Sequence, residues 1–385
     1  MDKNITTLLM NLISSAVCSR ALCDIGELSE EDLNLLYKIT KSHDLSQLLV
    51  APLEKVGALK PEYAVTEKFK KSLFTAIYRY EKSNFALNEI CSLFTDEGID
   101  HMPLKGAVIR AFYPTPYLRT SCDLDILVKQ EDVDRASELL ASRLNYRMEK
   151  KGRYDVSLFT PSGGHIELHF GLNGNNFRHA KSLVNVWQSS ETKEISPHRF
   201  EMTPEMFLFF HIYHTAKHFV HGGCGIKPFI DLWIIRNKIG YDEKKAEKLL
   251  EDDGLLDFYK KAVSLSEIWF DGKKHTSITN DMEDFVLGGG VYGNFEQHIA
   301  ISQNKKGGKL GHLLSRMFIS YKAMCSYYPS LLKCPLLFPL YQVRRWFRIL
   351  FCGGRSRAMN EIRMNNNLDQ NKKNRAKRLL DELGL

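Results

Sequence analysis

The sequence lacks the features that mark several large classes of protein. Its eight cysteines include no CxxC pair, which argues against a zinc ribbon, and their scatter is typical of reduced thiols. No run reaches the roughly 18 uncharged apolar residues of a membrane span; the nearest, Cys334 to Val343, is short and contains two prolines. The opening MDKNITTLLMNLISS lacks the basic-then-apolar order of a signal peptide. These absences predict a cytoplasmic protein.

Two common catalytic motifs are also missing. The glycine-rich stretch LGGGVYGN at 287–294 has no following Lys-Ser/Thr, so it is not a Walker loop. No GxSxG nucleophile elbow occurs. The chain also shows no internal repeat. The sequence therefore gives no support for a P-loop NTPase, a serine hydrolase or a repeat protein.

What is present is an ordinary globular composition. The chain has 385 residues, of which 44% are apolar and 26% charged, and its net charge is +7. This length predicts two or three domains and is sufficient for a large core. A mildly basic balance permits a polyanionic partner without requiring one.

The periodicity of the chain divides it into three regions, which predict an α+β fold: a mixed sheet with packed helices, flanked by helical regions. These regions are an N-terminal helical region at 1–95, an α/β core at 96–172, and a C-terminal helical domain with a basic tail at 173–385. The expected elements are a long helix over about 65–94, strands at 99–104 and 122–128, a helix at 130–144, a hairpin of 154–159 with 165–170, and helices at 206–220, 228–238, 244–250 and 255–270.

Two carboxylates alternate along the second expected strand. In the segment DLDILV, Leu124 and Ile126 point to one face of the strand, and Asp123 and Asp125 point to the other. Carboxylates about 7 Å apart on one strand face repel each other unless a cation lies between them. Mg²⁺ prefers such oxygen ligands. The alternative is a pair of solvent-facing acids on a half-exposed strand.

The expected hairpin brings a third acid. The same alternation places His165, Glu167 and His169 on one face of its second strand. If this strand lies beside the DLD strand, Glu167 joins Asp123 and Asp125. Three acids on one sheet face are suited to holding two Mg²⁺ ions about 4 Å apart. An ordinary exposed edge strand is the alternative.

Upstream, a short apolar run ends at Lys105-Gly106, where a helix is expected to begin. Glycine there lets backbone N–H groups approach a phosphate, and Lys105 adds positive charge. A plain tight turn is the alternative. Arg119, just before the acidic strand, is expected either to clamp a triphosphate or to pair with Asp123 or Asp125.

The order of LKG at 104–106, YPTPYLR at 113–119, DLDILV at 123–128 and IELHF at 166–170 resembles the DNA polymerase β-like nucleotidyltransferase superfamily, and more closely the bacterial uncharacterised nucleotidyltransferase family. The resemblance is sharpest over about 100–172. It is looser over 211–235 and at 327–346.

The resemblance implies Mg²⁺-dependent transfer of a nucleoside monophosphate from an NTP to a hydroxyl acceptor, with Mn²⁺ as an alternative metal. It matches Asp123, Asp125 and Glu167 to the metal ligands and catalytic acids, and implies that Glu167 assists deprotonation of the acceptor. Gly106 matches the glycine before the helix. Lys105, Gly106, Arg119 and His169 are the candidates for nucleotide binding.

This chain departs from the superfamily pattern at the glycine turn. Ala107 stands where a serine or glycine is usual, and residues 107–122 make the spacing to Asp123 longer than usual. Phosphate binding then depends on Lys105 or Arg119, or it is altered or lost. Three hypotheses follow: an active transferase, a catalytically silent nucleotidyltransferase-fold module, and a polyanion or membrane-surface interaction protein.

A histidine-rich helix is the second candidate site. His211, His214, His218 and His221 share one helix face at i, i+3, i+7 and i+10. Contact of His214, Lys217 or His218 with substrate, a zinc site, and plain interdomain packing are the alternatives. Asp231, on the next helix, is expected to fix a histidine tautomer or to contact substrate.

The basic cluster near the C-terminus contains Arg344, Arg345, Arg348, Arg355 and Arg357 among aromatic residues. It is interpreted as a solvated helix with an aromatic core face, a surface for anionic membrane, or a nucleic-acid contact. The last segment, from about 365 onwards, is expected to be a solvated helix or a frayed tail. The acceptor, the base of the NTP and the oligomeric state have no sequence signal.

Overall fold

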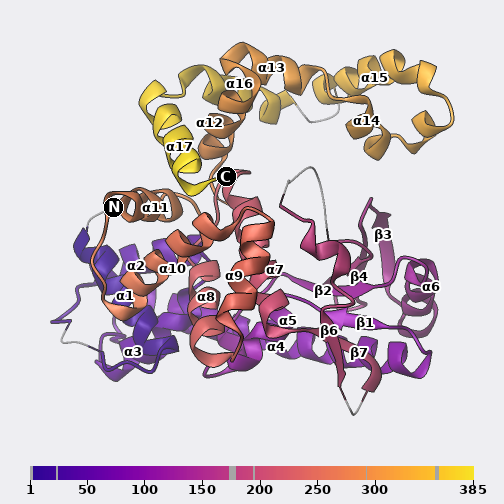
Figure 1. Ribbon diagram of the computed structural model, residues 1–385. Coiled ribbons are helices and arrows are strands. Elements are labelled where there is room, and N and C mark those ends of the chain that lie inside the picture. The colour runs from indigo at the N-terminus through magenta and orange to yellow at the C-terminus, as the bar shows by residue number, and fades with distance from the viewer. Residues whose placement is uncertain (1–2, 23–24, 173–178, 194–195, 292, 352–354) are drawn as a thin grey trace.

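The structure is a computed structural model that describes residues 3–22, 25–172, 179–193, 196–291, 293–351 and 355–385. Within these residues the expected mixed sheet has seven strands, in the spatial order β3-β4-β5-β2-β1-β7-β6 (Figure 1). The strands are β1 (His101–Pro103), β2 (Asp123–Val128), β3 (Arg147–Lys151), β4 (Asp155–Phe159), β5 (His165–His169), β6 (Ser190–Lys193) and β7 (Ser196–Met202). The α+β fold class is confirmed.

Strand β2 lies at the middle of the sheet and pairs with β5 in parallel. In this register Asp123 is opposite His165, and Asp125 is opposite Glu167. Strands β4 and β5 form the expected antiparallel hairpin. Parallel strands need a long crossover connection, and β2 and β5 are about forty residues apart in the chain. Their pairing therefore brings the polar residues of two distant segments to one sheet face.

The prediction that residues from 173 onwards are helical is wrong for 190–193 and 196–202. These segments form β6 and β7, and β7 pairs in parallel with β1, His101 lying opposite Arg199. Strand β3 was not predicted either. Both missed regions are polar, and every residue of β3 is exposed, so they lack the apolar alternation by which a strand is recognised.

The N-terminal region is helical, as predicted. Helix α2 begins after Ser29, whose hydroxyl accepts a hydrogen bond from the backbone of Asp32 while the Asp32 carboxylate accepts from Ser29. This reciprocal cap satisfies two free N–H groups of the first turn. The helices of this region are α1 (Lys3–Val17), α2 (Glu30–Ser42), α3 (Val50–Lys55) and α4 (Ala64–Asp96).

One face of the sheet packs against the C-terminal half of α4 and against α6 (Val133–Leu144). Leu124, Ile126 and Val128 of β2 are buried in this layer with Ile166 and Leu168 of β5. The alternation that buries these side chains turns the carboxylates of the same strands to the opposite face. The candidate site therefore lies on the face away from α4 and α6.

The remaining helices are one short helix between β1 and β2 and a series that follows β7 in the chain. They are α5 (Gly106–Ile109), α7 (Pro204–Phe219), α8 (Lys227–Lys238), α9 (Glu243–Asp252), α10 (Leu256–Asp271), α11 (Ser277–Leu287), α12 (Phe295–Lys306), α13 (Gly308–Met317), α14 (Tyr321–Tyr327), α15 (Phe338–Phe351), α16 (Arg355–Asn367) and α17 (Gln370–Leu383). The four expected helices between 206 and 270 are confirmed as α7 to α10. No helix among the described residues is long and apolar enough to cross a membrane.

Helices from both ends of the chain share one core. Buried residues of α1, α2 and α3 join those of α7 to α11 in a single cluster. Helix α17 also belongs to it, with Ala376, Leu379, Leu380 and Leu383 buried. The expectation of a solvated or frayed end is therefore wrong for 370–383. The apolar positions of α17 recur at i, i+3, i+4 and i+7, which is the spacing of a packed helix face.

Candidate active site

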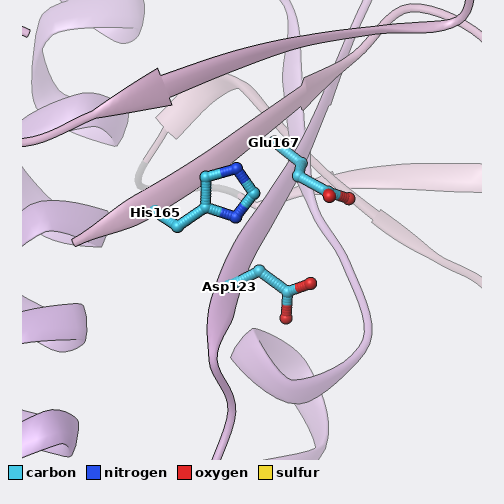
Figure 2. A group of neighbouring side chains, drawn as sticks. All are labelled: Asp123, His165 and Glu167. Atoms are coloured by element: carbon cyan, nitrogen blue, oxygen red, sulfur yellow. The ribbon is translucent and has the colours of Figure 1, made fainter. Parts of the chain in front are cut away.

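The three predicted carboxylates lie on one face of the sheet, on neighbouring strands. Figure 2 shows Asp123 projecting from β2 to the same side as His165 and Glu167 of β5. One ligand atom from each of these three residues lies within 4.8 Å of the others, and the same holds for Asp125, Glu167 and His169. Glu167 belongs to both groups and lies opposite Asp125 in the strand register.

The chemistry of this donor set fits a divalent cation. Carboxylate oxygens are the protein ligands that Mg²⁺ and Mn²⁺ prefer. Asp123, Asp125 and Glu167 can hold the ion, with His165 and His169 within reach as nitrogen donors. Sequence reasoning placed His165 on this face and gave it no role. Its position directly opposite Asp123 depends on the pairing of β2 with β5.

Asp125 is the most buried carboxylate of the three and is held by two cations. Its Oδ1 atom accepts hydrogen bonds from Lys105 Nζ at 2.7 Å and from His169 Nε2 at 2.7 Å. Burial favours the neutral carboxyl, but Lys105 and His169 hold the pKa of Asp125 below its ordinary value. Burial alone would lower the pKa of His169. The hydrogen bonds of His169 to Asp125 and Glu167 have the larger combined effect and raise its pKa to about 9. His169 is therefore protonated at neutral pH.

Asp123 is in the opposite situation. Burial and the negative charge of Asp125 raise its pKa, and Glu167 adds to this effect. Its nearest donor is Ser121, whose hydroxyl lies 3.1 Å from Asp123 Oδ1. The Asp123 carboxylate is thus repelled by Asp125 and Glu167, and among the described residues it forms no ion pair that would relieve this repulsion. A bound cation beside it would remove that repulsion.

The turn at Lys105 carries backbone strain. Lys105 has φ +48° and ψ −120°, a conformation that residues with a side chain rarely adopt. Such strain costs on the order of 1–3 kcal/mol and persists where the surrounding contacts over-determine it. The ion pair of Lys105 with Asp125 is one such contact. The strained backbone thus directs the ammonium of Lys105 to the acidic face.

The neighbouring glycine gives less support to the phosphate site that the sequence predicts. Gly106 begins α5, which has only four residues and is too short to act as a helix N-terminus for an anion. A Cβ atom added at Gly106 would lie 3.5 Å from Arg119 and Ser121, which is ordinary contact. Nucleotide binding by Gly106 remains a prediction that rests on the resemblance.

Arg119 does not pair with Asp123 or Asp125, so that expectation is wrong. Its guanidinium forms a bidentate pair with Asp231 of α8, with Nε to Oδ1 at 2.9 Å and Nη2 to Oδ2 at 2.8 Å. Tyr113 also donates to Asp231 Oδ1, at 2.7 Å. Among the described residues Asp231 bonds no histidine, so its expected role in fixing a tautomer is also wrong. These three side chains tie the loop before β2 to α8.

Helix α7 carries three titratable side chains within electrostatic range of Lys105. Burial and the charge of Lys105 lower the pKa values of His214 and Lys217. Burial and the charge of Lys217 lower the pKa of His218 to about 4. His218 Nε2 lies 3.3 Å from His214 Nε2. Both imidazoles are therefore neutral at pH 7. They lie within electrostatic range of Lys105, and Lys217 lies within electrostatic range of Glu167.

The histidine row of α7 forms no group of three potential metal ligands among the described residues. The described residues form two groups of three potential metal ligands, and neither contains a histidine of α7. His211 Nε2 is bonded to the carbonyl of Pro228, and His221 Nδ1 to the carbonyl of Lys217. The zinc alternative is thus not supported, while substrate contact by His214, Lys217, His218 or Asp231 remains a prediction.

Sequence reasoning assigned no chemistry to the N-terminal 95 residues, and the structure brings one of them to the edge of the site. Lys227 Nζ of α8 lies 2.8 Å from Asp44 Oδ2 and 2.9 Å from Thr120 Oγ1. Asp44 also accepts a hydrogen bond from Thr120 Oγ1, at 2.5 Å. This cluster fixes Thr120, three residues before Asp123. No local pattern signals a contact between residues 44 and 227.

The family comparison agrees with this geometry. A family model described as "Uncharacterised nucleotidyltransferase" matches residues 29–271. The chain belongs to this nucleotidyltransferase family. The match contains the whole sheet, the acidic face and helices α7 to α10, and it ends before α11. The resemblance seen in the sequence is therefore confirmed, over a longer segment than 100–172.

Two further comparisons add little to the family assignment. A search of curated proteins finds no match. Among solved structures, this nucleotidyltransferase is similar to the antibiotic-resistance factor ANT(2'')-Ia, determined in solution. The identity is 12% and the TM-score 0.34, over 49% of this chain and 97% of that one.

Proposed function

We propose that the protein is a metal-dependent nucleotidyltransferase that moves a nucleoside monophosphate from an NTP to a hydroxyl acceptor and releases pyrophosphate. The observation that carries the proposal is the convergence of Asp123, Asp125 and Glu167 on one sheet face, with Glu167 common to both donor groups. The family membership supports the same reaction class. Mg²⁺, or Mn²⁺ in its place, would neutralise charge on the phosphates as a Lewis acid.

The chain's own cations suit a triphosphate. Lys105 and Lys217 are two ammonium groups within electrostatic range of each other beside the acids. His214 and His218, both neutral, offer hydrogen bonds to phosphate, ribose or base without adding charge. Transfer of a nucleotidyl group depends on positioning and charge neutralisation more than on covalent chemistry by the protein. Two elements supply these groups, the β1–α5 turn and α7.

A silent module is the second candidate function. It is favoured by the pairing of Lys105 and His169 with Asp125, which balances that carboxylate without a metal ion, and by Ala107 in the turn. Such a module would bind nucleotide without consuming it. The acceptor for an active enzyme could be a small-molecule hydroxyl, a protein hydroxyl or an RNA end.

Isothermal titration of the full chain with ATP, GTP, CTP and UTP tests the proposal, in Mg²⁺, in Mn²⁺ and in EDTA. One nucleotide is expected to bind only with metal, and Asp123→Asn is expected to abolish that binding. Asp134→Asn is the matched control, because Asp134 is an exposed acid of the same region that pairs with Lys151. Control and wild type should bind alike.

The release of pyrophosphate with a panel of hydroxyl acceptors separates the two candidate functions. Release that needs Asp123 supports the transferase. Metal-dependent binding of an NTP with no release for any acceptor favours the silent module. A folded wild-type protein that binds no nucleotide in either metal contradicts both.

A further inference from the structure

The C-terminal part of the chain contains a long segment without acidic residues. Residues 297–360 contain no Asp or Glu and eleven Lys or Arg residues, whereas the rest of the chain has four more acidic than basic residues. The positive charge of the protein therefore comes from this segment alone. It lies outside the family match, which ends at 271.

Within this segment α14 and α15 pack on each other, and α15 packs on α16. Figure 1 shows α14 and α15 at the far end of the layer formed by the last helices, beyond α13 and α16. The side of α15 that faces its neighbours carries aromatic and polar side chains, among them Phe338 against Tyr321 and Trp346 against Phe318. Gln342 Nε2 donates to the carbonyl of Ile319 at 2.6 Å, and Trp346 Nε1 donates to the carbonyl of Met317 at 2.8 Å. These hydrogen bonds fix the rotation of α15 about its axis.

The outer side of α15 is apolar, which is the reverse of an ordinary surface helix. Leu340, Val343, Phe347 and Phe351 follow one another at spacings of three and four residues, so they form one stripe. Leu336 continues the stripe at the preceding turn and is 89% exposed, and Phe351 is 74% exposed. We call these five residues the outer stripe. Large side chains gathered in this way on a surface mark an interaction site.

Two arginines border the outer stripe. Arg344 and Arg348 are both exposed, and their guanidinium groups lie 5.6 Å and 5.9 Å from the centre of the Tyr328 ring. Neither has an ion pair with any acid in the part of the chain that the structure describes. Their positive charge is therefore available to an external anion.

We propose that the outer stripe with Arg344 and Arg348 binds the surface of an anionic lipid bilayer. A helix with an apolar stripe and bordering arginines lies in the interface plane, where acyl chains receive the apolar side chains and anionic headgroups pair with the cations. Nucleic acid would satisfy the arginines and leave the outer stripe in water. A second copy of the chain would bring the same unpaired cations together with no acid between them.

Flotation of the full chain with lipid vesicles tests this surface. The wild type is expected to float with phosphatidylcholine–phosphatidylglycerol vesicles and not with phosphatidylcholine alone. Arg344→Gln with Arg348→Gln should lower the partition coefficient about 25-fold, at about 5-fold for each arginine. Leu340→Ser with Phe347→Ser should lower it by about 100-fold, because both side chains lose their burial in the membrane.

Phe74→Ser with Phe85→Ser is the matched control, because these two aromatic residues of α4 are equally exposed and lie outside the acid-free segment. It should float like the wild type. All variants should keep the wild-type circular dichroism and NTP titration, so this test is independent of the proposed reaction.

Three results would overturn the proposal. One is a wild type that does not float with the anionic vesicles, or that floats equally after Leu340→Ser with Phe347→Ser. Another is a dimer in sedimentation that the same double variant dissociates, since a second copy would then cover the stripe. The third is tighter binding to single-stranded RNA than to the anionic vesicles.

Discussion

The two aspartates of β2 should respond in opposite ways to the loss of their charge. Asp125→Asn removes the carboxylate that holds Lys105 and His169, each at 2.7 Å. The side chain of Asp125 is 4% exposed and that of Lys105 is 23% exposed, so the cations lose their partner in a site with little water. Breaking such a buried pair costs about 3–5 kcal/mol, and the partial exposure of Lys105 favours the lower end, about 3 kcal/mol.

Asp123→Asn should leave the stability of the metal-free protein unchanged or raise it by about 1 kcal/mol. The charge that it removes is the one whose pKa is raised by burial and by the neighbouring carboxylates. The amide oxygen can still accept from the Ser121 hydroxyl. Both variants should nevertheless lose metal-dependent nucleotide binding. Stability and binding are thus separated by two substitutions of the same type, two residues apart.

Urea unfolding in EDTA, followed by far-UV circular dichroism, measures the stability difference, with Asp134→Asn as the exposed control. The expected order of unfolding midpoints is Asp123→Asn at or above wild type, the control equal to wild type, and Asp125→Asn clearly below. Equal destabilisation by the two β2 variants would refute the assignment of Lys105 and His169 to Asp125 as its stabilising cations. So would a lower midpoint for Asp123→Asn than for Asp125→Asn.

Two further predictions concern the surroundings of the acidic face. The pKa of His218 falls from 6.5 to about 4 on folding, so between these pH values the folded protein binds fewer protons at His218 than the unfolded chain does. The free energy of unfolding should therefore fall as the pH drops from about 6.5 to 4. His218→Gln should flatten that part of the stability–pH curve. Arg119→Met should cost about 3–5 kcal/mol in urea unfolding because it leaves Asp231 buried without its cation, and adding Asp231→Leu should recover most of the loss. A pH curve that is unchanged in His218→Gln, or a double variant no more stable than Arg119→Met, would contradict these two predictions.

The features that could be predicted from the sequence are those set by local alternation. The period of two along DLDILV and HIELH places the three carboxylates on one side of their strands, and the structure has them so. The long helix α4, the hairpin and helices α7 to α10 also follow from local pattern and turn residues. The strands that escaped prediction, β3, β6 and β7, are polar and lie in the outer parts of the sheet, where burial imposes no alternation.

The partners of the site residues could not be predicted, because each depends on contacts between distant segments. Arg119 and Asp231 are 112 residues apart in the chain, and Lys227 and Asp44 are 183 apart. The sequence around Arg119 predicts that this cation pairs with an acid. The nearest acids in the sequence are Asp123 and Asp125, so the prediction falls on them. In the structure Lys105 and His169 pair with Asp125, and Arg119 pairs with Asp231 of α8. Asp123 has no ion pair among the described residues and accepts from the Ser121 hydroxyl.

The charge arrangement also accounts for the strained turn at Lys105. A lysine at φ +48° is disfavoured against glycine, which adopts this conformation without cost. Replacing Lys105 by glycine would relieve the strain. It would also remove one of the two cations that pair with Asp125, leaving His169, and would remove the ammonium that lies within electrostatic range of Lys217. The strain is therefore offset by the ion pair to Asp125 in the metal-free protein. If the proposed reaction holds, the same ammonium is also placed beside the phosphates of the NTP, so Lys105→Gly is expected to lower both stability and nucleotide binding.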